Sequence, residues 1–472
     1  MPVKKEIYLF FVLCFVAFFN PFISCKKDKF ITNGGNVSFS TDTLKFDTVF
    51  TTLGSVTRSF KIYNNNNKRI KFDEIRLEVG DTSYFRMNVD GNPTKSIRDV
   101  ELAPNDSLYI FVALTINPSQ NNLPFLLEDK VVVSYNGTQQ NVPLQAFGQD
   151  AHYINDSTLN TQTWINDKPY VIMGQIGALV DSNQVLTIQK GCRIYVHANC
   201  KLYVDGTLRI FGTKTDSVIF QGDRLDRDYF GYKDYPGEWG GLHFLKNAHQ
   251  CSINYTIIKN AGLLDAAVYV QPTPSIANPI IEFNKCIIEN SAGYGVLCFN
   301  TNIKMNNCLI HTCGLQNIAI IEGGNYEFNH CTIATYGGLG INHAQQPSMA
   351  VLNYRDISLT QFAEADLNAT YTNCIIYGSL DDETFFNKKG AAAYNVKMEN
   401  CMFKNTTNLG IVNIINRIPT QDPQFIDVNK WDYHVQNTSP CKAVGIYQGA
   451  VPDDLDDKTR TPPTTIGCYE AP

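Results

Sequence analysis

The sequence lacks the patterns of a helical or a nucleic-acid-binding protein. Alanine is sparse, and no long stretch shows the apolar spacing of an amphipathic helix. The formal net charge is −6 and no block of basic residues stands in the body of the chain, so nucleic acid is not an expected partner. Frequent Asn, together with 24 Tyr and 28 Phe in 472 residues, instead predicts an all-β protein.

Familiar catalytic and metal-binding motifs are missing as well. The chain has no Gly-x-Ser-x-Gly, His-Glu-x-x-His or phosphate-loop sequence, and its 8 His residues are scattered. No Cys-x-x-Cys pair occurs among the 14 Cys residues, so the ligand spacing of a zinc site is absent. We therefore expect no cofactor and no metal site.

The first residues have the order of a secretory signal. Lys4 and Lys5 precede an apolar run, Ile7 to Phe19, and an Asn-Pro pair ends it. The run is short for a membrane span, and no second run approaches spanning length. The next four residues, Phe-Ile-Ser-Cys, resemble the lipobox of bacterial lipoproteins, which implies a lipid on Cys25. A cleaved signal or a short anchor with a chance cysteine is the alternative.

This resemblance implies that residues 1–24 are a lipoprotein signal peptide and residues 25–37 a tether. The expected partner is a membrane, reached through the acyl chains on Cys25, because several chains anchor far better than one. The expected location is the outer membrane. The tract after Cys25 is mostly Lys with one Asp28 and departs from the acidic surface-export signal of some bacteria. The cell surface and the periplasmic face therefore both remain open.

Residues 38–150 consist of short alternating apolar and polar runs, separated by Asn, Asp, Gly and Pro turns. This pattern predicts an antiparallel β-sandwich with an immunoglobulin-like outline. The segment holds no Cys and no Trp, unlike an antibody domain. The stretch from Phe46 to Ile75 resembles the immunoglobulin-like modules beneath the binding domains of bacterial surface lipoproteins. The implied role is a spacer, with a protein-binding module as the alternative.

A short motif with a central cysteine recurs farther along the chain. NKCII, NNCLI, NHCTI, TNCII and ENCMF place cysteine in one column, at Cys286, Cys308, Cys331, Cys374 and Cys401, and Thr256 falls in the same column. Two successive intervals are 22 and 23 residues. Short strands with single-residue corners at this period predict a parallel β-helix. The longer interval of 43 residues is close to two coils, or to one coil with an insertion around 345–365.

Residues 163–420 resemble the right-handed parallel β-helix proteins, notably in KPYVIMG, LTIQKGCRIYVHANCKLYVDGTLRIFGT and GEWGGLHF. Residues 421–472, with DPQFID, SPCKAVG, DLDDKTR and IGCYE, resemble the closing segment of such helices. Here Asp457 replaces the usual Gly and Cys468 the usual Ala. The resemblance specifies the fold better than the activity, because this scaffold hosts lyases, hydrolases, adhesins and structural proteins.

The repeated cysteines fit packing better than chemistry. Equivalent residues of successive coils stack about 4.8 Å apart, and a small residue that tolerates apolar surroundings suits an inward column. Side chains that run parallel are awkward partners for disulfides. A buried ladder of reduced cysteines is therefore predicted. One disulfide among Cys192, Cys200, Cys308 and Cys313 stays open as an alternative.

The best candidate binding loop lies between Gly222 and Gly241. Aromatic side chains can stack on sugar rings while carboxylates bond hydroxyls, and the candidate residues are Tyr229, Phe230, Tyr232, Asp234, Tyr235, Glu238 and Trp239. A coil-to-coil loop with self-neutralising charge is the structural alternative. We expect no catalytic residues among them.

A second acidic set consists of Asp453, Asp454, Asp456 and Asp457. Carboxylates are ligands that suit calcium, but these four lack the spacing of a known calcium loop, so a role in stabilising the closing segment is favoured.

Two classes of function follow for the whole chain. The first is a non-enzymatic lipoprotein whose β-helix binds glycan or an outer-membrane protein. The second is a polysaccharide lyase or glycoside hydrolase on the same scaffold, which needs converging carboxylates, or a carboxylate with Arg or Lys.

Overall fold

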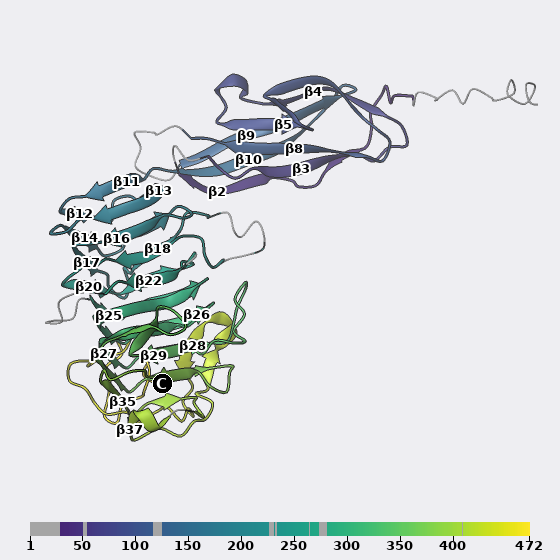
Figure 1. Ribbon diagram of the computed structural model, residues 1–472. Coiled ribbons are helices and arrows are strands. Elements are labelled where there is room, and N and C mark those ends of the chain that lie inside the picture. The colour runs from purple at the N-terminus through teal and green to yellow at the C-terminus, as the bar shows by residue number, and fades with distance from the viewer. Residues whose placement is uncertain are drawn as a thin grey trace, which may run out of the picture. The chain divides into compact units, whose positions relative to one another are not determined.

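The computed structural model describes residues 29–472, except 51–53, 117–124, 226–230, 232–233, 264, 273–280 and 408. Contacts divide the chain into two compact units, and the boundary falls between Gly148 and Gln149. Figure 1 shows strands almost throughout, in keeping with the predicted all-β class. No helix in the described part is long and apolar enough to cross a membrane.

The first unit is a β-sandwich of two antiparallel sheets that enclose one core. Buried and exposed residues alternate along β3 and β8, as expected for strands with one face on the core. The first sheet contains, in spatial order, β1 (Val37–Phe39), β3 (Arg58–Asn64), β8 (Ser107–Leu114), β5 (Phe85–Val89) and β6 (Asn92–Thr94). The second contains β2 (Leu44–Phe50), β10 (Thr138–Gln149), β9 (Phe125–Tyr135), β4 (Ile70–Leu77) and β7 (Ser96–Leu102), and the 3₁₀ turn η1 is Gly80–Thr82.

The second unit is a parallel β-helix, as the sequence predicts, and its coils begin at His152. Strands of successive coils stack in chain order (Figure 1) and form three faces. Face A contains β12 (Gln162–Trp164), β14 (Val185–Gln189), β17 (Thr207–Phe211), β20 (Cys251–Asn254), β23 (Ile281–Asn284), the second parts of β25 (Tyr294–Asn306) and β27 (Ile318–Asn329), β32 (Leu367–Thr372), β35 (Tyr394–Glu399) and β37 (Val412–Ile415).

Faces B and C complete each coil. Face B contains the first parts of β11 (His152–Leu159) and β13 (Tyr170–Val180), then β15 (Arg193–Val196), β18 (Val218–Gly222), β21 (Thr256–Lys259), β24 (Ile287–Ser291), β26 (Leu309–Cys313), β28 (Thr332–Thr335), β33 (Ile375–Gly378) and β36 (Met402–Phe403). Face C contains the second parts of β11 and β13, then β16 (Lys201–Val204), β19 (Leu242–Phe244), β22 (Ala266–Val270), the first parts of β25 and β27, β29 (Met349–Leu352) and β34 (Thr384–Asn387).

The predicted repeat is in register from coil to coil. The residues two positions before the cysteine column, which we call the aligned column, pair in succession: Asn254, Asn284, Asn306, Asn329, Thr372 and Glu399. The pairing of Asn329 with Thr372 makes the 43-residue interval a single coil. The extra length forms the corner segment 336–348 and a hairpin of β30 (Tyr354–Asp356) and β31 (Phe362–Glu364).

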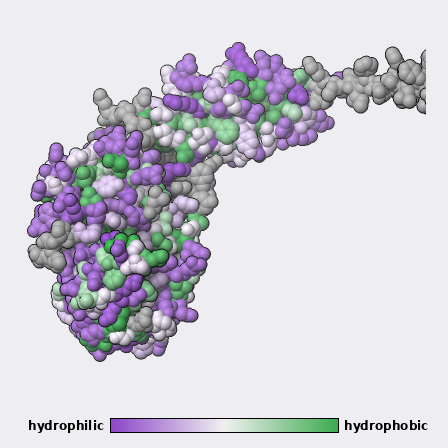
Figure 2. Space-filling view, in the orientation of Figure 1, coloured by the Kyte–Doolittle hydropathy of each residue, from purple (hydrophilic) through white to green (hydrophobic). Residues whose placement is uncertain are grey.

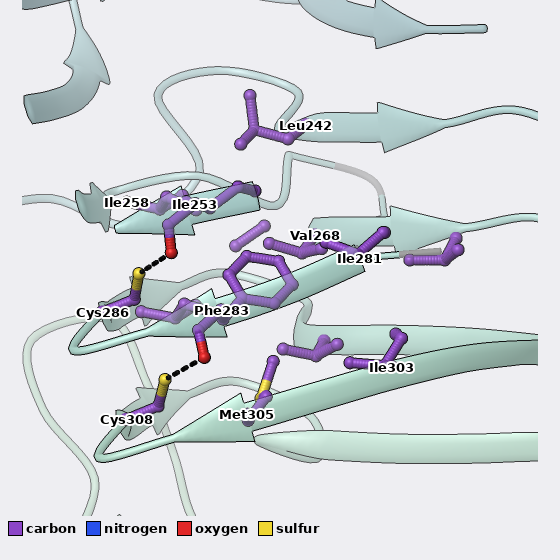
Figure 3. Close-up of a cluster of buried hydrophobic side chains, with 14 of the residues drawn as sticks. Leu242, Ile253, Ile258, Val268, Ile281, Phe283, Cys286, Ile303, Met305 and Cys308 are labelled. Carbon is purple, nitrogen blue, oxygen red and sulfur yellow. Dashed lines mark hydrogen bonds between the residues drawn. The ribbon is translucent and has the colours of Figure 1, made fainter. Parts of the chain in front are cut away.

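The cysteine column faces inward and packs the core. Its five thiols are buried and donate to backbone carbonyls of the preceding coil at 3.2 to 3.7 Å, as Cys286 and Cys308 do in Figure 3. Thr256 fills the same place and donates to the Asn254 carbonyl at 3.1 Å, as the cysteines do to the residue two positions earlier. All twelve described cysteines are free. The predicted packing ladder is confirmed, and the alternative of a disulfide is wrong.

Each corner between faces A and B is one residue in the left-handed conformation. This row of corners consists of Tyr255, Lys285, Asn307, His330, Asn373 and Asn400, with φ between 43° and 55°. Asn tolerates this conformation better than other non-glycine residues, which explains why it precedes cysteine so often. The corner turns the chain sharply, so that the next residue, the cysteine, points into the core.

The closing segment runs alongside the coils on face B (Figure 1). It includes β38 (Phe425–Asp427) and β39 (Asp432–Val435) with the turn η4 (Val428–Lys430), after the turn η3 (Leu409–Ile411) of the last coil. Arg460 is buried and donates to Asn307 Oδ1 at 2.7 Å and to Glu470 Oε2 at 3.0 Å. Asn373 and Asn400 donate to carbonyls of the same segment. The row of corners is thus the docking line of the closing segment.

Candidate functional site

Only part of the predicted binding loop belongs to the described structure. Tyr229, Phe230 and Tyr232 lie outside the described residues, as does Cys25. Asp234 accepts hydrogen bonds from Lys259 Nζ at 3.0 Å and from Asn260 Nδ2 at 3.3 Å. Tyr235 is 38% exposed. The structure thus brings Asp234 and Tyr235 to the corner between faces B and C.

The side chains of Glu238 and Trp239 are buried and do not line a binding surface. Trp239 is fully buried, stacks 6.3 Å from Phe220 and donates its indole N–H to the Lys259 carbonyl at 2.9 Å. Glu238 is 6% exposed. A buried ring cannot stack on a sugar, so this half of the loop anchors the coil. Asp234 and Tyr235 remain the described members of the set that a ligand can reach.

The acidic set of the closing segment ties that segment to the coils. Asp457 contacts Lys285 and Tyr255, and Asp456 contacts Lys214 and His434. Burial alone would raise the pKa of Asp456, but the hydrogen bonds from Lys214 and His434 outweigh it and the pKa lies below its ordinary value. These carboxylates therefore act as internal acceptors, as the structural interpretation predicts. No three His, Cys, Asp or Glu side chains of the described residues are placed to hold a metal ion.

Face A carries a feature that the sequence analysis did not single out. Asn325 Nδ2 donates to Asn302 Oδ1 at 2.7 Å, Asn368 to Asn325 at 2.9 Å, and Asn395 to Asn368 at 2.9 Å. These four residues form a continuous line of side-chain amides across successive coils, which we call the amide ladder. Its last two members are exposed. The ladder could have been found from the Asn that stands four positions before the aligned column in four coils.

Polar side chains flank the amide ladder. A second outward column pairs Glu282, Lys304, Glu327, Thr370 and Lys397 in register. Lys304 and Glu327 form an ion pair at 3.3 Å, and Lys397 and Glu399 form one at 2.7 Å. Charge on this face is therefore largely balanced, and the amides remain its most regular hydrogen-bonding groups. The side of the molecule seen in Figure 2 is likewise mostly hydrophilic, with apolar residues in separate patches.

The ladder ends in a groove on face A. The groove has a volume of about 520 Å³ and is lined by Asn368, Thr370, Tyr394, Asn395, Val396, Lys397, Gly410, Ile411, Val412 and Asn413. Three amides, a hydroxyl, a cation and one aromatic ring therefore meet at the last coils. Such a mixture of polar groups around a small apolar floor suits an uncharged, hydroxyl-rich ligand.

Face C holds a cluster of ionisable side chains. Lys201 Nζ lies 3.5 Å and His243 Nε2 lies 3.6 Å from the same Asp265 oxygen. The His243 ring stacks 4.9 Å from Tyr269 and meets Tyr203 edge-on at 5.6 Å. Lys201 crosses the backbone at Gly240, where a Cβ would collide with the lysine stem. The Gly-Gly pair before β19 therefore lets a lysine of one coil reach an aspartate two coils on.

Electrostatics distinguish His243 within this cluster. Burial, reinforced by the Lys201 cation, lowers the pKa of His243 to about 3, so the ring is neutral at neutral pH. Its Nε2 atom is buried and has no hydrogen-bond partner within the part of the chain that the structure describes. Burial raises the pKa of Tyr203 and of Tyr269, and the Asp265 charge adds to both shifts. A neutral acceptor, a carboxylate and a cation thus converge on one outward face.

Neither a protein-family model nor a curated protein matches the chain. Among solved structures, the Agl-KA catalytic domain aligns over 76% of each chain at 10% identity, with a TM-score of 0.27. A family 123 glycoside hydrolase from Clostridium perfringens aligns over 25% of this chain and 30% of its own at 7% identity, with a TM-score of 0.18. The VesB protease of Vibrio cholerae covers 24% and 31% at 13% identity, with a TM-score of 0.17. Likeness this slight decides neither fold nor function.

Proposed function

We propose that this chain is an extracytoplasmic lipoprotein whose β-helix binds glycan through face A. The observation that carries the proposal is the amide ladder with the groove at its end. A side-chain amide offers two N–H donors and an oxygen with two lone pairs. A ladder bond uses only one donor or one lone pair of each partner, so hydrogen-bonding capacity remains for a ligand. Sugar hydroxyls both donate and accept hydrogen bonds, so they can pair with the remaining N–H donors and oxygen acceptors of the ladder amides.

The repeat of the ladder favours a polymer over a single sugar. Successive coils place equivalent amides about 4.8 Å apart, so an extended chain of sugars can meet the same pair of groups repeatedly. Weak contacts made several times along one ligand add to useful affinity. The groove, with Tyr394 and Lys397, then offers a place for the end of such a chain or for a branch.

The test is affinity electrophoresis of the soluble chain from residue 26 in gels that contain dextran, mannan, xylan or polygalacturonate. We expect retardation in at least one gel and its loss in the double variant Asn368→Ala, Asn395→Ala. Asn160→Ala, which removes an exposed amide outside the ladder, is the matched control and keeps the binding. Retardation by dextran, mannan or xylan that survives the double variant contradicts a site on face A, and no retardation in any gel favours an outer-membrane protein as the partner.

A second candidate function is a polysaccharide lyase or hydrolase, favoured by the cluster on face C. Lys201 and His243 approach the same oxygen of Asp265, and a carboxylate, a lysine and a histidine are the residue types that such chemistry uses. Product release from the same polymers, followed as new reducing ends or as ultraviolet absorbance of unsaturated ends, tests it. Activity that disappears in Asp265→Asn supports an enzyme, whereas binding without products supports a binding module.

Lipid attachment at Cys25 is part of the proposal and rests on the sequence. Its test is metabolic labelling with an alkyne fatty acid in a Gram-negative host. We expect label on the parent chain, and a Cys25→Ala variant that is unlabelled and leaves the membrane fraction. Equal labelling of both chains would contradict lipidation at this cysteine. Protease accessibility of intact cells then distinguishes the cell surface from the periplasmic face.

A further inference from the structure

The outer surface of the first sheet of the β-sandwich carries two exposed aromatic rings. Tyr109 and Phe111 are 41% and 38% exposed, and both belong to β8, whose intervening residues are buried in the core. Their rings stack with centroids 5.7 Å apart and planes 13° from parallel. Two aromatic rings held parallel in solvent form a rigid platform, because the strand fixes their spacing.

Strands on both sides supply polar groups to this platform. β3 places Lys61 opposite Tyr109 and Ser59 opposite Phe111. On the other side, β5 places Asn88 opposite Phe111, and it places Arg86 opposite Ala113, two residues farther along β8. Residues directly opposite on neighbouring strands are close enough for their side chains to touch one ligand. The aromatic pair is therefore framed by hydrogen-bonding side chains on two edges.

The charge of this frame is mainly positive. Lys61 Nζ lies 4.6 Å from the centre of the Tyr109 ring, and the Tyr109 hydroxyl raises the pKa of that lysine, so Lys61 stays a cation. Arg86 is exposed, and among the described residues no carboxylate forms an ion pair with it. Asp90 follows β5 and is the acidic group nearest in register to Tyr109. Two cations and one carboxylate thus surround the rings.

We infer that this surface is a second carbohydrate site, specific for acidic polysaccharides built of hexuronate units. Pyranose rings present C–H groups that pack on aromatic faces, and Tyr109 with Phe111 provides the stack. Carboxylates of successive sugars lie within reach of Lys61 on one side and Arg86 on the other, where Arg can bind a carboxylate through two N–H groups. The site goes beyond the proposed role of face A and lies in the unit that the sequence predicts to be a spacer.

Polygalacturonate and its fully methyl-esterified form test this site with the whole soluble chain, by isothermal titration at 20 mM and 200 mM salt. We expect binding of the acid form, weakened by salt, and little binding of the ester, because esterification removes the charge that Lys61 and Arg86 recognise. Tyr109→Ala with Phe111→Ala should weaken binding of the acid form by about ten-fold or more. Arg86→Gln should weaken it less and reduce its salt dependence.

Controls separate this site from face A. Phe147→Ala removes a ring that is 52% exposed and lies on the second sheet, and it should leave binding unchanged. Asn368→Ala with Asn395→Ala should also leave binding of the acid form at the sandwich intact. Equal binding of acid and ester, unchanged binding in the Tyr109 and Phe111 variant, or no binding by the parent chain would each overturn the inference. Thermal unfolding at the parent temperature confirms that the variants are folded, since both rings are exposed.

Discussion

Faces A and B of the β-helix belong to the same coils and enclose the same interior. Their outward surfaces differ, because the closing segment covers face B and leaves face A exposed to solvent. On face B the outward column Ile287, Leu309, Thr332, Ile375 and Met402 is mostly apolar, and the closing segment covers it. On face A the outward columns carry amides, hydroxyls and paired charges, and the last two ladder residues stay in solvent. The side chains in one outward column therefore decide whether a face is used for folding or left for a ligand.

The row of corners is the boundary between the covered face B and the exposed face A. Side chains there face the closing segment, and Asn307, Asn373 and Asn400 all bond to it. The same left-handed residues that turn each coil thus also hold the covering segment in place. Within the β-helix, ligand binding is accordingly expected on the surfaces that this segment does not cover, which are faces A and C.

The largest expected effect comes from removing the anchor of the covering segment. Arg460→Ala leaves the Asn307 side-chain oxygen without its donor and Glu470 without its cation, and breaking a buried ion pair costs about 3–5 kcal/mol. Urea unfolding followed by fluorescence measures this loss. Lys430→Ala, an exposed lysine of the same segment, should change stability by less than about 0.5 kcal/mol. An Arg460→Ala chain as stable as the parent would contradict the anchoring role.

A paired substitution sharpens the contrast between the faces. Ile375 on face B is 1% exposed, and a Cβ on Gly467 would collide with it. Ile375→Ala should therefore destabilise the fold by about 2–4 kcal/mol. Thr370→Ala, an outward residue of face A one strand earlier, should cost about 0.5 kcal/mol or less. Similar losses for both variants in the same unfolding assay would show that the two faces contribute equally to folding.

Acid should weaken the β-helix before it affects most carboxylates. Burial lowers the pKa of His243 to about 3 and also lowers the pKa of His330 below the ordinary value. Each histidine is neutral when folded but takes up a proton when unfolded, so stability falls as pH drops from about 6.5 toward the folded pKa. At pH 5 the loss is roughly 2 kcal/mol for His243. His243→Phe should keep the stack on Tyr269 and reduce the difference in stability between pH 7 and pH 5, measured by urea unfolding.

Substitutions in the inward cysteine column should have the smallest effect on stability. Cys331→Ser can keep the bond to the Asn329 carbonyl, as Thr256 does at its own position. We expect it to cost less than Cys331→Ala, which leaves a small cavity and loses about 1 kcal/mol. The twelve buried thiols should also resist an aromatic disulfide reagent until denaturant is added. Rapid labelling of the native chain would contradict their packing role.

The sequence predicts the repeat well because the same steric demand recurs in every coil. Cys or Thr at the inward position follows from side-chain volume, so this column is visible without coordinates. The left-handed corners beside it are Asn in three of six coils and are not apparent as a column in the sequence. The composition of the candidate loop does not reveal that Trp239 turns inward to stack on Phe220. The cluster on face C was beyond prediction, because coils of unequal length decide that Lys201 meets Asp265.

The assignment of face A as a glycan-binding surface is tested by binding of the soluble chain to neutral and acidic polysaccharides, compared between the parent and Asn368→Ala with Asn395→Ala. We expect at least one polymer to bind the parent chain and to bind the double variant at least about ten-fold more weakly, with unchanged thermal unfolding. A double variant that binds every polymer as the parent does would contradict the assignment of face A as the glycan-binding surface.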